Sequence, residues 1–276
     1  MLIDIDRVTN LIKEAAETLV LPRFSSLDET DIEAKPSPRD PEDIVTIVDR
    51  EVEAALTSSL QREILSAPVL GEEAAHHDRS LLDLTSADGP LWIIDPIDGT
   101  KNFAAGKPSF GIMVAFVVDG ITQAAWIVLP ALRETYVAER DCGTFFNGNR
   151  ARVPPLMREV PPRGSILTRY MSEELRHTVT EGLADVVQVV EPSGCAATEY
   201  TNILRGVLEF VVYYRLLPWD HAAPALVLSE GGGCAKHASG GDYTVRSQNQ
   251  LTIVARDSET SSRLHARAKP NGQRDL

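Results

Sequence analysis

The residues best placed for chemistry lie in 92–103, where the chain reads Trp-Ile-Ile-Asp-Pro-Ile-Asp-Gly-Thr-Lys-Asn-Phe. The segment begins with the aromatic and β-branched residues Trp92, Ile93 and Ile94, which favour a buried strand. The proline after Asp95 and the glycine Gly99 favour a tight bend, which is expected to hold Asp95 and Asp98 on one side. Thr100 then stands at a helix start, where free backbone N–H groups favour an anion. The segment predicts a corner that binds divalent cations beside a phosphoryl group, although Asp-Pro and Asp-Gly are also common in surface turns.

Further carboxylates stand where other apolar segments end. They are Asp49 after Ile-Val-Thr-Ile-Val, Glu72 and Glu73 after Val-Leu-Gly, and Asp220 after Leu-Pro-Trp. Two carboxylates about 4 Å apart repel by ~4 kcal/mol at an effective dielectric constant near 20. Acids that converge in this way must take up protons or gather cations. Hard oxygen ligands favour Mg²⁺ or Ca²⁺, and Mg²⁺ is the usual partner of phosphate chemistry.

Each of these acids also has a purely structural alternative. Thr46 and Asp49 stand three residues apart at a predicted helix start, so they could form only a capping box. Glu72 and Glu73 are both possible ligands, and Glu72 is favoured because it directly follows the glycine. Asp220 could be an acid in the first turn of a helix that offsets the helix dipole.

Four segments together resemble the signature set of the inositol monophosphatase family. This family belongs to a superfamily of lithium-sensitive, magnesium-dependent phosphatases that includes fructose-1,6-bisphosphatases and bisphosphate nucleotidases. The segments read Asp-Ile-Val-Thr-x-x-Asp from Asp43, Gly-Glu-Glu from Gly71, Trp-x-Ile-Asp-Pro-Ile-Asp-Gly-Thr-x-Asn-Phe from Trp92, and Trp-Asp-x-Ala-Ala from Trp219. The resemblance covers nearly the whole chain, from about residue 8 to about residue 255.

The resemblance implies a site with either two or three Mg²⁺ ions, of which the third would be bound more weakly. Its implied metal ligands are Glu72, Asp95, Ile97 through its carbonyl, Asp98 and Asp220. The implied catalytic residues are Asp49, Thr100 and Glu72. Of these, Asp49 and Thr100 orient and deprotonate a water that attacks phosphorus directly, so no covalent nucleophile is needed.

The resemblance also implies where substrate is bound. The implied substrate-binding residues are Gly99, Thr100, Gly194, Cys195, Ala196, Tyr213 and Asp220. Inositol-preferring members usually have a Glu where this chain has Tyr213, and nucleotidases commonly have a Glu where it has Asn102. Tyr213 therefore either relaxes the selection for sugar hydroxyls or merely packs at a strand end.

The predicted activity is hydrolysis of a small polyol or sugar phosphate, with Mg²⁺ as cofactor. One alternative is the same chemistry on histidinol phosphate, fructose 1,6-bisphosphate or adenosine 3′,5′-bisphosphate. Another is a regulatory or binding protein whose phosphatase activity is incidental. Family resemblance also implies a homodimer.

Composition limits the other partners. The chain has 276 residues and a net charge of −13, which argues against nucleic-acid and anionic-membrane partners. The three cysteines, Cys142, Cys195 and Cys234, are widely spaced, so we expect reduced thiols and neither disulfides nor a zinc site. The sequence contains no apolar run of the ~18 residues needed for a membrane helix and no signal-peptide pattern. A cytoplasmic enzyme is expected.

The arrangement of apolar and polar stretches predicts the α/β class. The resemblance implies that its layers form an α-β-α-β-α sandwich. Residues 1–155 are expected to form an α+β subdomain with an antiparallel sheet and most of the metal ligands. Residues 156–256 are expected to form an α/β subdomain with a mixed or parallel sheet, Asp220 and the substrate loop. The polar residues 257–276 suggest a flexible tail rather than a basic binding arm. Residues 27–43 are expected to be a loop, either a mobile flap near the site or a passive connector.

Hydrophobic periodicity places the individual elements. Helices are predicted at 4–22, from about 49 to 64, at 172–183 and 195–204, and after 220. Strands are predicted at 109–118, 121–129, 134–139, 165–168, 186–190, 207–213 and 251–254.

Overall fold

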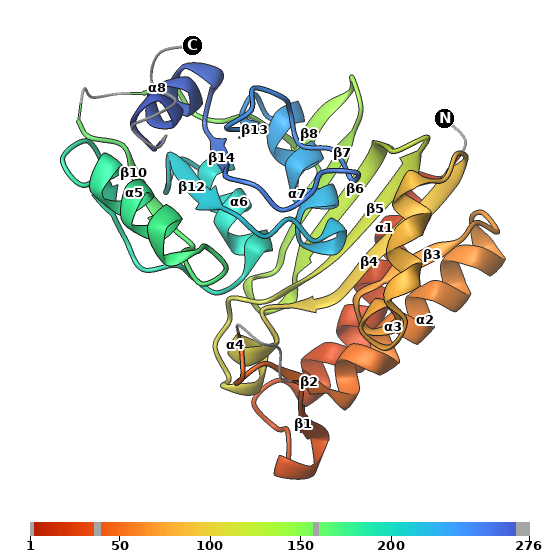
Figure 1. Ribbon diagram of the computed structural model, residues 1–276. Coiled ribbons are helices and arrows are strands. Elements are labelled where there is room, and N and C mark those ends of the chain that lie inside the picture. Colours follow the sequence, from red (N-terminus) through yellow and green to blue (C-terminus); the bar gives the residue numbers. More distant parts are fainter. Residues whose placement is uncertain (1–2, 36–39, 157–159, 269–276) are drawn as a thin grey trace.

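The two larger β-sheets of the described residues alternate with three layers of helices (Figure 1). The computed structural model describes residues 3–35, 40–156 and 160–268. The layering confirms the predicted α/β sandwich. Within the described residues, no helix is both long and apolar enough to cross a membrane.

The first sheet has seven strands in the order β3-β4-β5-β6-β7-β8-β9. They are β3 (Val69–Gly71), β4 (Pro90–Asp98), β5 (Gly111–Val118), β6 (Ile121–Leu129), β7 (Glu134–Glu139), β8 (Gly143–Phe146) and β9 (Asn149–Ala151). All neighbours are antiparallel except β3 and β4, which run parallel. The predicted strands at 121–129 and 134–139 are confirmed, and the turn at Asp119-Gly120 directly precedes the first of them.

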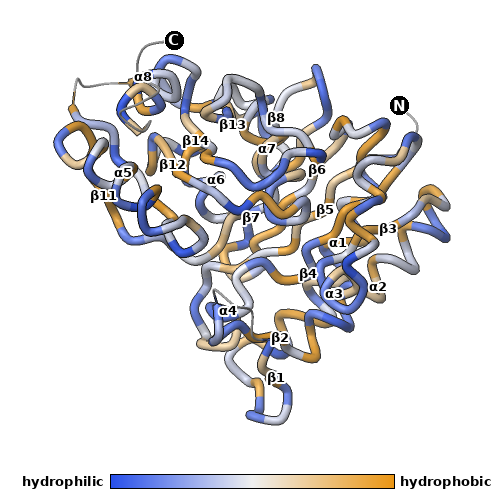
Figure 2. The backbone as a smooth tube through the Cα atoms, viewed as in Figure 1, coloured by the Kyte–Doolittle hydropathy of each residue, from blue (hydrophilic) through white to orange (hydrophobic). Residues whose placement is uncertain are grey.

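Helices cover both faces of this sheet. The outer face packs against α1 (Ile5–Ala15) and α2 (Ile47–Glu63), whose apolar sides join the aromatic rings of Trp92 and Trp126 in one core cluster. The inner face packs against α6 (Ala196–Leu204) and α7 (Pro218–Glu230) in a second cluster. Figure 2 shows hydrophobic residues along these strands, as burial on both faces requires.

The second sheet has five strands in the order β11-β10-β12-β14-β13. They are β10 (Arg163–Ile166), β11 (Gln188–Val189), β12 (Phe210–Tyr213), β13 (Cys234–His237) and β14 (Thr252–Ala255). The sheet is mixed: β10 runs parallel to β11 and β12, and the other pairs are antiparallel. Helices α5 (Glu173–Leu183) and α8 (Ser258–Ala268) form the outermost layer.

Two predictions near the N-terminus need correction. The helix predicted over 4–22 is α-helical only to Ala15; a π-helical turn (Ala16–Val20) and a 3₁₀ turn (Leu21–Arg23) follow it. The loop predicted at 27–43 contains a 3₁₀ turn (Glu29–Asp31) and the short strand β1 (Ile32–Ala34).

Strand β1 pairs antiparallel with β2 (Ile44–Thr46). Residues 36–39 lie outside the described residues, and the flap at 27–43 stays a prediction. The remaining short elements are α3 (Glu72–His77), α4 (Thr100–Ala104) and 3₁₀ segments at Arg79–Ser86 and Pro130–Leu132.

The prediction of a flexible tail at 257–276 is wrong for residues 258–268. These form α8, which buries Leu264 and Ala268 against the second sheet and α5. Helix α8 is polar overall and its apolar face is narrow, so its composition is similar to that of a flexible tail. Residues 269–276 lie outside the described residues. The proposed division at 155/156 falls between β9 and β10 and stays a prediction.

Candidate active site

Asp95 and Asp98 lie at the C-terminal end of strand β4 in the first sheet. Asp95 pairs with Met113 and Asp98 with Gly111, and the register shifts between them. Residues three apart on a regular strand would face opposite sides of the sheet, so this irregularity lets both carboxylates serve one site. The chain bends at Gly99, as predicted, and its φ of +82° favours glycine, whereas Pro96 stays within strand β4.

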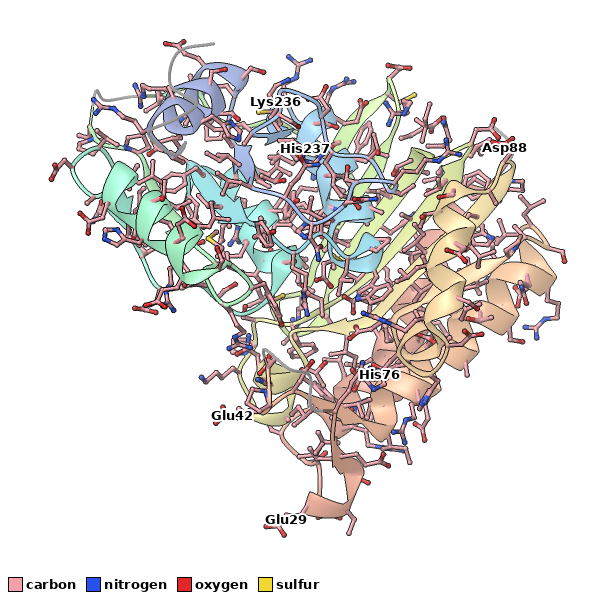
Figure 3. All side chains as sticks on the ribbon, in the orientation of Figure 1. Glu29, Glu42, His76, Asp88, Lys236 and His237 are labelled. Atoms are coloured by element: carbon pink, nitrogen blue, oxygen red, sulfur yellow. The ribbon has the colours of Figure 1, made fainter. Side chains whose placement is uncertain are left out.

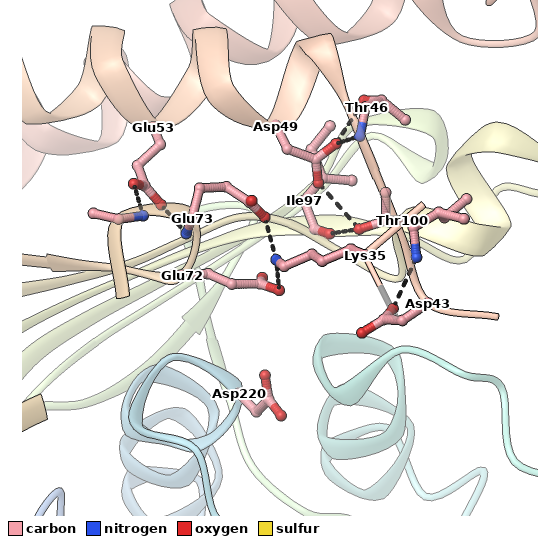
Figure 4. Close-up of polar contacts among 12 residues, drawn as sticks. Lys35, Asp43, Thr46, Asp49, Glu53, Glu72, Glu73, Ile97, Thr100 and Asp220 are labelled. Atoms are coloured by element: carbon pink, nitrogen blue, oxygen red, sulfur yellow. Dashed lines mark hydrogen bonds and ion pairs between the residues drawn. The ribbon is translucent and has the colours of Figure 1, made fainter. Parts of the chain in front are cut away.

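Asp49 lies at the start of α2 with both carboxylate oxygens engaged (Figure 4). Its Oδ2 accepts from the backbone N–H of Thr46 at 2.9 Å and from the Thr46 hydroxyl at 2.5 Å. Its Oδ1 lies 3.0 Å from the hydroxyl of Thr100, which also lies 2.9 Å from the Ile97 carbonyl oxygen. The capping box between Thr46 and Asp49 is therefore present, and so is the contact between Asp49 and Thr100.

Glu72 and Glu73 share the ammonium group of Lys35. Lys35 Nζ lies 3.0 Å from Glu72 Oε1 and 2.6 Å from Glu73 Oε1. The carboxylate of Glu53, on α2, accepts from the backbone N–H groups of Glu73 and Ala74 at 2.8 and 2.9 Å. Glu53 thus caps α3 and positions both acids. Glu72 is the one that faces Asp220 across the site (Figure 4).

Asp98 is held by the N-terminus of α6. Its Oδ2 accepts from the backbone N–H of Ala197 at 2.6 Å and from the thiol of Cys195 at 3.0 Å. Gly194, just before this helix, has a φ of +75°. Asn102 donates to the carbonyl of Ser193 at 2.8 Å, which ties the same loop to α4. The structure therefore brings the predicted substrate loop against Asp98 and Gly99.

Asp220 lies in the first turn of α7 and reaches the site from the second half of the chain. Its Oδ2 accepts from Arg215 Nη2 at 3.3 Å. The Arg215 guanidinium also lies over the ring of Tyr170, 4.1 Å from the ring centroid. Asp220 is therefore an acid in the first turn of α7, and its carboxylate also faces Glu72 across the site (Figure 4).

Tyr213 lies at the end of β12 and is only 5% exposed. Its ring stacks on Tyr200 at 5.8 Å between centroids and meets the edge of His221 at 4.8 Å. Its hydroxyl is buried without a hydrogen-bond partner among the described residues. This environment favours the alternative that Tyr213 packs at a strand end.

The sequence profile of the Inositol monophosphatase family matches residues 4–272. The chain belongs to this family. It is 32% identical over 210 residues to the fructose-1,6-bisphosphatase/inositol-1-monophosphatase of Thermotoga maritima, covering 75% of this chain and 76% of that protein. It is 30% identical over 234 residues to the histidinol-phosphatase of Chlorobaculum parvum, covering 84% and 85%.

The solved structure of the Thermotoga maritima IMPase has the same fold. It matches with a TM-score of 0.78 at 26% identity and covers 95% of this chain and 96% of its own. Family membership and relatives named as phosphatases make this chain a phosphoric monoester hydrolase. The named relatives differ in their substrates.

Burial and mutual repulsion raise the pKa values of the carboxyls in this inositol monophosphatase family site. Burial raises the pKa of Asp49 to about 7, and burial together with Asp220 raises that of Asp98 to about 7. Burial, Glu72 and Asp98 raise the pKa of Asp95 well above its ordinary value. Burial also raises the pKa values of Glu72 and Asp220, opposed by Lys35 and Arg215 respectively. A bound cation would relieve this excess of negative charge.

The donor chemistry fits a hard metal ion. Asp95 is 1% exposed, and its Oδ1 is buried without a hydrogen-bond partner within the described residues. The surrounding donors are carboxylate and carbonyl oxygens, which Mg²⁺ prefers. In the part of the chain that the structure describes, no three Asp, Glu, His or Cys side chains are grouped closely enough to hold one ion. The division of the ligands among individual ions therefore stays a prediction.

Histidines contribute little to this oxygen-rich site. Figure 3 shows His76 and His237 in separate parts of the molecule, on α3 and β13. The His221 ring lies next to Asp220 in sequence, but its nitrogens contact the Tyr200 hydroxyl at 2.9 Å and the Arg215 carbonyl at 3.0 Å. His221 thus joins the packing behind the site.

Sequence reasoning missed four charged residues around the family motifs: Lys35, Asp40, Glu53 and Arg215. Asp40 pairs with Lys101 Nζ at 2.8 Å and with Arg169, and so links the 27–43 segment to α4 and to the second half of the chain. Glu53 could have been found, because it lies four residues after Asp49 on the same predicted helix. The other three stand in irregular segments, where no periodicity marks them.

Proposed function

We propose that this phosphatase is a Mg²⁺-dependent phosphomonoesterase that hydrolyses a small polyol or sugar phosphate. The observation that best supports a metal site is the buried Oδ1 of Asp95, which has no hydrogen-bond partner among the described residues and lies among acids with raised pKa values. The proposed metal ligands are Glu72, Asp95, the Ile97 carbonyl, Asp98 and Asp220. When bound, Mg²⁺ supplies the positive charge that activates a water and offsets charge on the phosphate and the leaving oxygen.

Asp49 and Thr100 are the proposed water-orienting pair. The Thr100 hydroxyl has one proton and two acceptors in reach, Asp49 Oδ1 at 3.0 Å and the Ile97 carbonyl at 2.9 Å. When this proton points to Asp49, the hydroxyl oxygen keeps lone pairs that can accept from a water. Asp49, with a pKa of about 7, can take up a proton near neutral pH.

The proposed substrate contacts come from two segments that lie next to Asp98. The backbone N–H groups around Gly99 and Thr100, at the start of α4, are the proposed donors to the phosphate oxygens. Gly194, Cys195 and Ala196 form the facing wall, next to Asp98. Because Tyr213 is buried, we assign it a supporting role behind this wall rather than direct contact with substrate.

The experiment is an activity screen of the purified protein against phosphorylated metabolites. The panel holds inositol 1-phosphate, glycerol phosphate, histidinol phosphate, fructose 1,6-bisphosphate and adenosine 3′,5′-bisphosphate, each with Mg²⁺ and with a chelator. We expect Mg²⁺-dependent turnover, highest for a polyol or sugar phosphate. Full activity after exhaustive removal of divalent ions would contradict the metal proposal. Turnover of none of these compounds would favour a regulatory or binding role.

Lithium inhibition, a homodimer and a cytoplasmic location are further parts of this proposal, which rest on family membership. Light scattering of the purified chain tests the dimer, because it separates a mass near 30.2 kDa from twice that value.

A further inference from the structure

We infer a second ligand site, separate from the acidic site, for an anionic amphiphile: a molecule with a carboxylate or phosphate head and an apolar body. The site is a surface cavity of about 780 Å³ beside α8. Figure 1 shows α8 at the opposite end of the molecule from α4, where Thr100 lies. The volume falls in the range of roughly 300–1,000 Å³ that is typical of small-molecule pockets.

Three arginines line this cavity: Arg256, Arg263 and Arg267. Among the described residues that line it, the only carboxylate is that of Glu209, whose Oε2 already accepts from the backbone N–H of Arg163 at 2.7 Å. The whole chain carries a net charge of −13, so a cavity with three cations and one anion is a local reversal of charge. Such a reversal favours an anionic ligand.

Arg256 is a buried part of this cavity and is only 9% exposed. Its Nη2 donates to the Pro154 carbonyl at 2.6 Å, and its Nε to Asp257 at 3.2 Å. Its Nη1 forms an ion pair with Glu209 Oε1 at 3.7 Å, a distance too long for a hydrogen bond. The guanidinium is thus fixed in place while Nη1 can still donate to a ligand.

Packing of α8 places the other two arginines. The helix buries Ser261, Leu264 and Ala268, and at Gly182 an added Cβ would lie 2.1 Å from the Arg267 carbonyl oxygen, so α5 and α8 are in close contact. Arg263 and Arg267 are one helical turn apart, so their side chains emerge on the same side of α8. Among the described residues neither forms an ion pair, and both charges are available to a ligand.

An apolar wall completes the cavity and decides the class of ligand. It includes Leu156, Val160 and Val186, of which Leu156 is 50% and Val160 54% exposed. A simple anion would leave this wall in water, and a neutral apolar molecule would cover the arginines without pairing them, which costs free energy. A ligand with both an anionic head and an apolar body satisfies both parts of the surface.

The test is isothermal titration calorimetry of the full-length protein with octanoate and with octylphosphonate, which the phosphatase cannot hydrolyse. We expect one of the two to bind with one molecule per chain, and the tighter one identifies the head group. The double variant R263Q/R267Q should weaken binding about tenfold or more, as expected for loss of charged hydrogen bonds. The control R79Q/R176Q removes two exposed charges outside the cavity and should leave binding unchanged.

Inorganic phosphate and octyl glucoside complete the design, because each carries only one of the two required parts. Both should bind at least about tenfold more weakly than the amphiphile. Equal binding of inorganic phosphate and octylphosphonate would overturn the inference, as would equal binding of octyl glucoside. Unchanged binding to R263Q/R267Q, with the variant still folded by circular dichroism, would also overturn it.

Discussion

At the scale of single residues, the acids of the site differ in which oxygens are already engaged. Both oxygens of Asp49 contact threonines, and Oδ2 of Asp98 is held by α6. Asp95 Oδ1 is buried with no partner among the described residues. This pattern separates an acid that orients a neighbour from an acid that can receive a cation. Substitutions at the two kinds of position should therefore have different effects.

The first prediction concerns Thr100. Thr100→Ala removes the hydroxyl between Asp49 and the Ile97 carbonyl, so kcat should fall by about 100-fold, the lower range for a lost proton-transfer group. Mg²⁺ affinity should change little, because the hydroxyl is not a proposed ligand. Steady-state kinetics and Mg²⁺ titration calorimetry measure the two effects separately.

Asp95→Asn is the matched comparison for Thr100→Ala and should lose Mg²⁺ affinity and turnover together. If Thr100→Ala abolished Mg²⁺ binding while Asp95→Asn retained it, the two roles would be reversed. Thr46→Ala controls for the helix cap and should lower stability by about 1 kcal/mol.

The second prediction concerns Tyr213. Because its buried hydroxyl has no partner in the described part of the chain, Tyr213→Phe removes an uncompensated polar group. The free energy of unfolding should stay the same or rise by about 1 kcal/mol, and kcat/KM should change less than about twofold. Urea denaturation and kinetics on two substrates test this. A large, substrate-dependent loss of kcat/KM would instead restore Tyr213 as a direct substrate contact.

At the scale of elements, helix termini organise the site. The start of α2 carries Asp49, the start of α3 carries Glu72, and the start of α6 holds Asp98. These starts were partly predictable, because Thr46 and Asp49 have the spacing of a capping box. The α6 contact was not, since it joins residues 99 positions apart in the chain.

The third prediction tests the cap on α3. Glu53→Ala leaves the buried N–H groups of Glu73 and Ala74 without their acceptor, so stability should fall by about 1–3 kcal/mol. Mg²⁺ affinity should fall as well, because Glu72 then loses its fixed position. Chemical denaturation and calorimetry measure both.

Glu51→Ala, on the same helix, is the control for Glu53→Ala and should cost under about 1 kcal/mol, since Glu51 forms only a partly exposed ion pair with Arg23. Equal effects of the two substitutions would rule out a special role for Glu53.

The errors in predicting helices and strands can be traced to short exposed strands and to a helix that depends on packing. Strand β6 is long and largely apolar, and in β7 an apolar centre stands between Glu134 and Glu139, so the bounds of both strands were predicted correctly. The sequence analysis did not identify β1 or β9, which are three residues long and largely exposed, so alternation could not show them. Helix α8 was missed because its stability comes from packing against α5 and the second sheet.

At the scale of the whole molecule, the proposed site draws its acids from both halves of the chain. Asp49, Glu72, Asp95 and Asp98 come from the first half, and Asp220 comes from α7 in the second. Local patterns predicted each acid at the end of an apolar segment, but not that these ends meet. The order of the four motifs and their family resemblance supplied that link. The pairing of Lys35 with Glu72 depends on packing and could not be predicted.

The last prediction concerns stability and pH. Folding raises the pKa values of Asp49 and Asp98 from ordinary values near 4 to about 7, so the folded chain holds these protons more tightly than the unfolded chain. The contribution of these groups to stability is therefore fully present below about pH 4 and is lost as pH rises through about 7. Mg²⁺ binds carboxylates in their ionised form and should offset this loss.

Melting temperatures of chelated and Mg²⁺-loaded protein, compared at about pH 5 and about pH 8, test that expectation. The stabilisation by Mg²⁺ should be larger at the higher pH by at least about 2–4 °C, the shift that about 1 kcal/mol produces in a chain of this size. Asp95→Asn should reduce the difference, because it removes one ionised carboxylate from the group. An equal Mg²⁺ effect at both pH values would mean that the site acids are already ionised in the metal-free fold, and the charge balance proposed for the site would have to be abandoned.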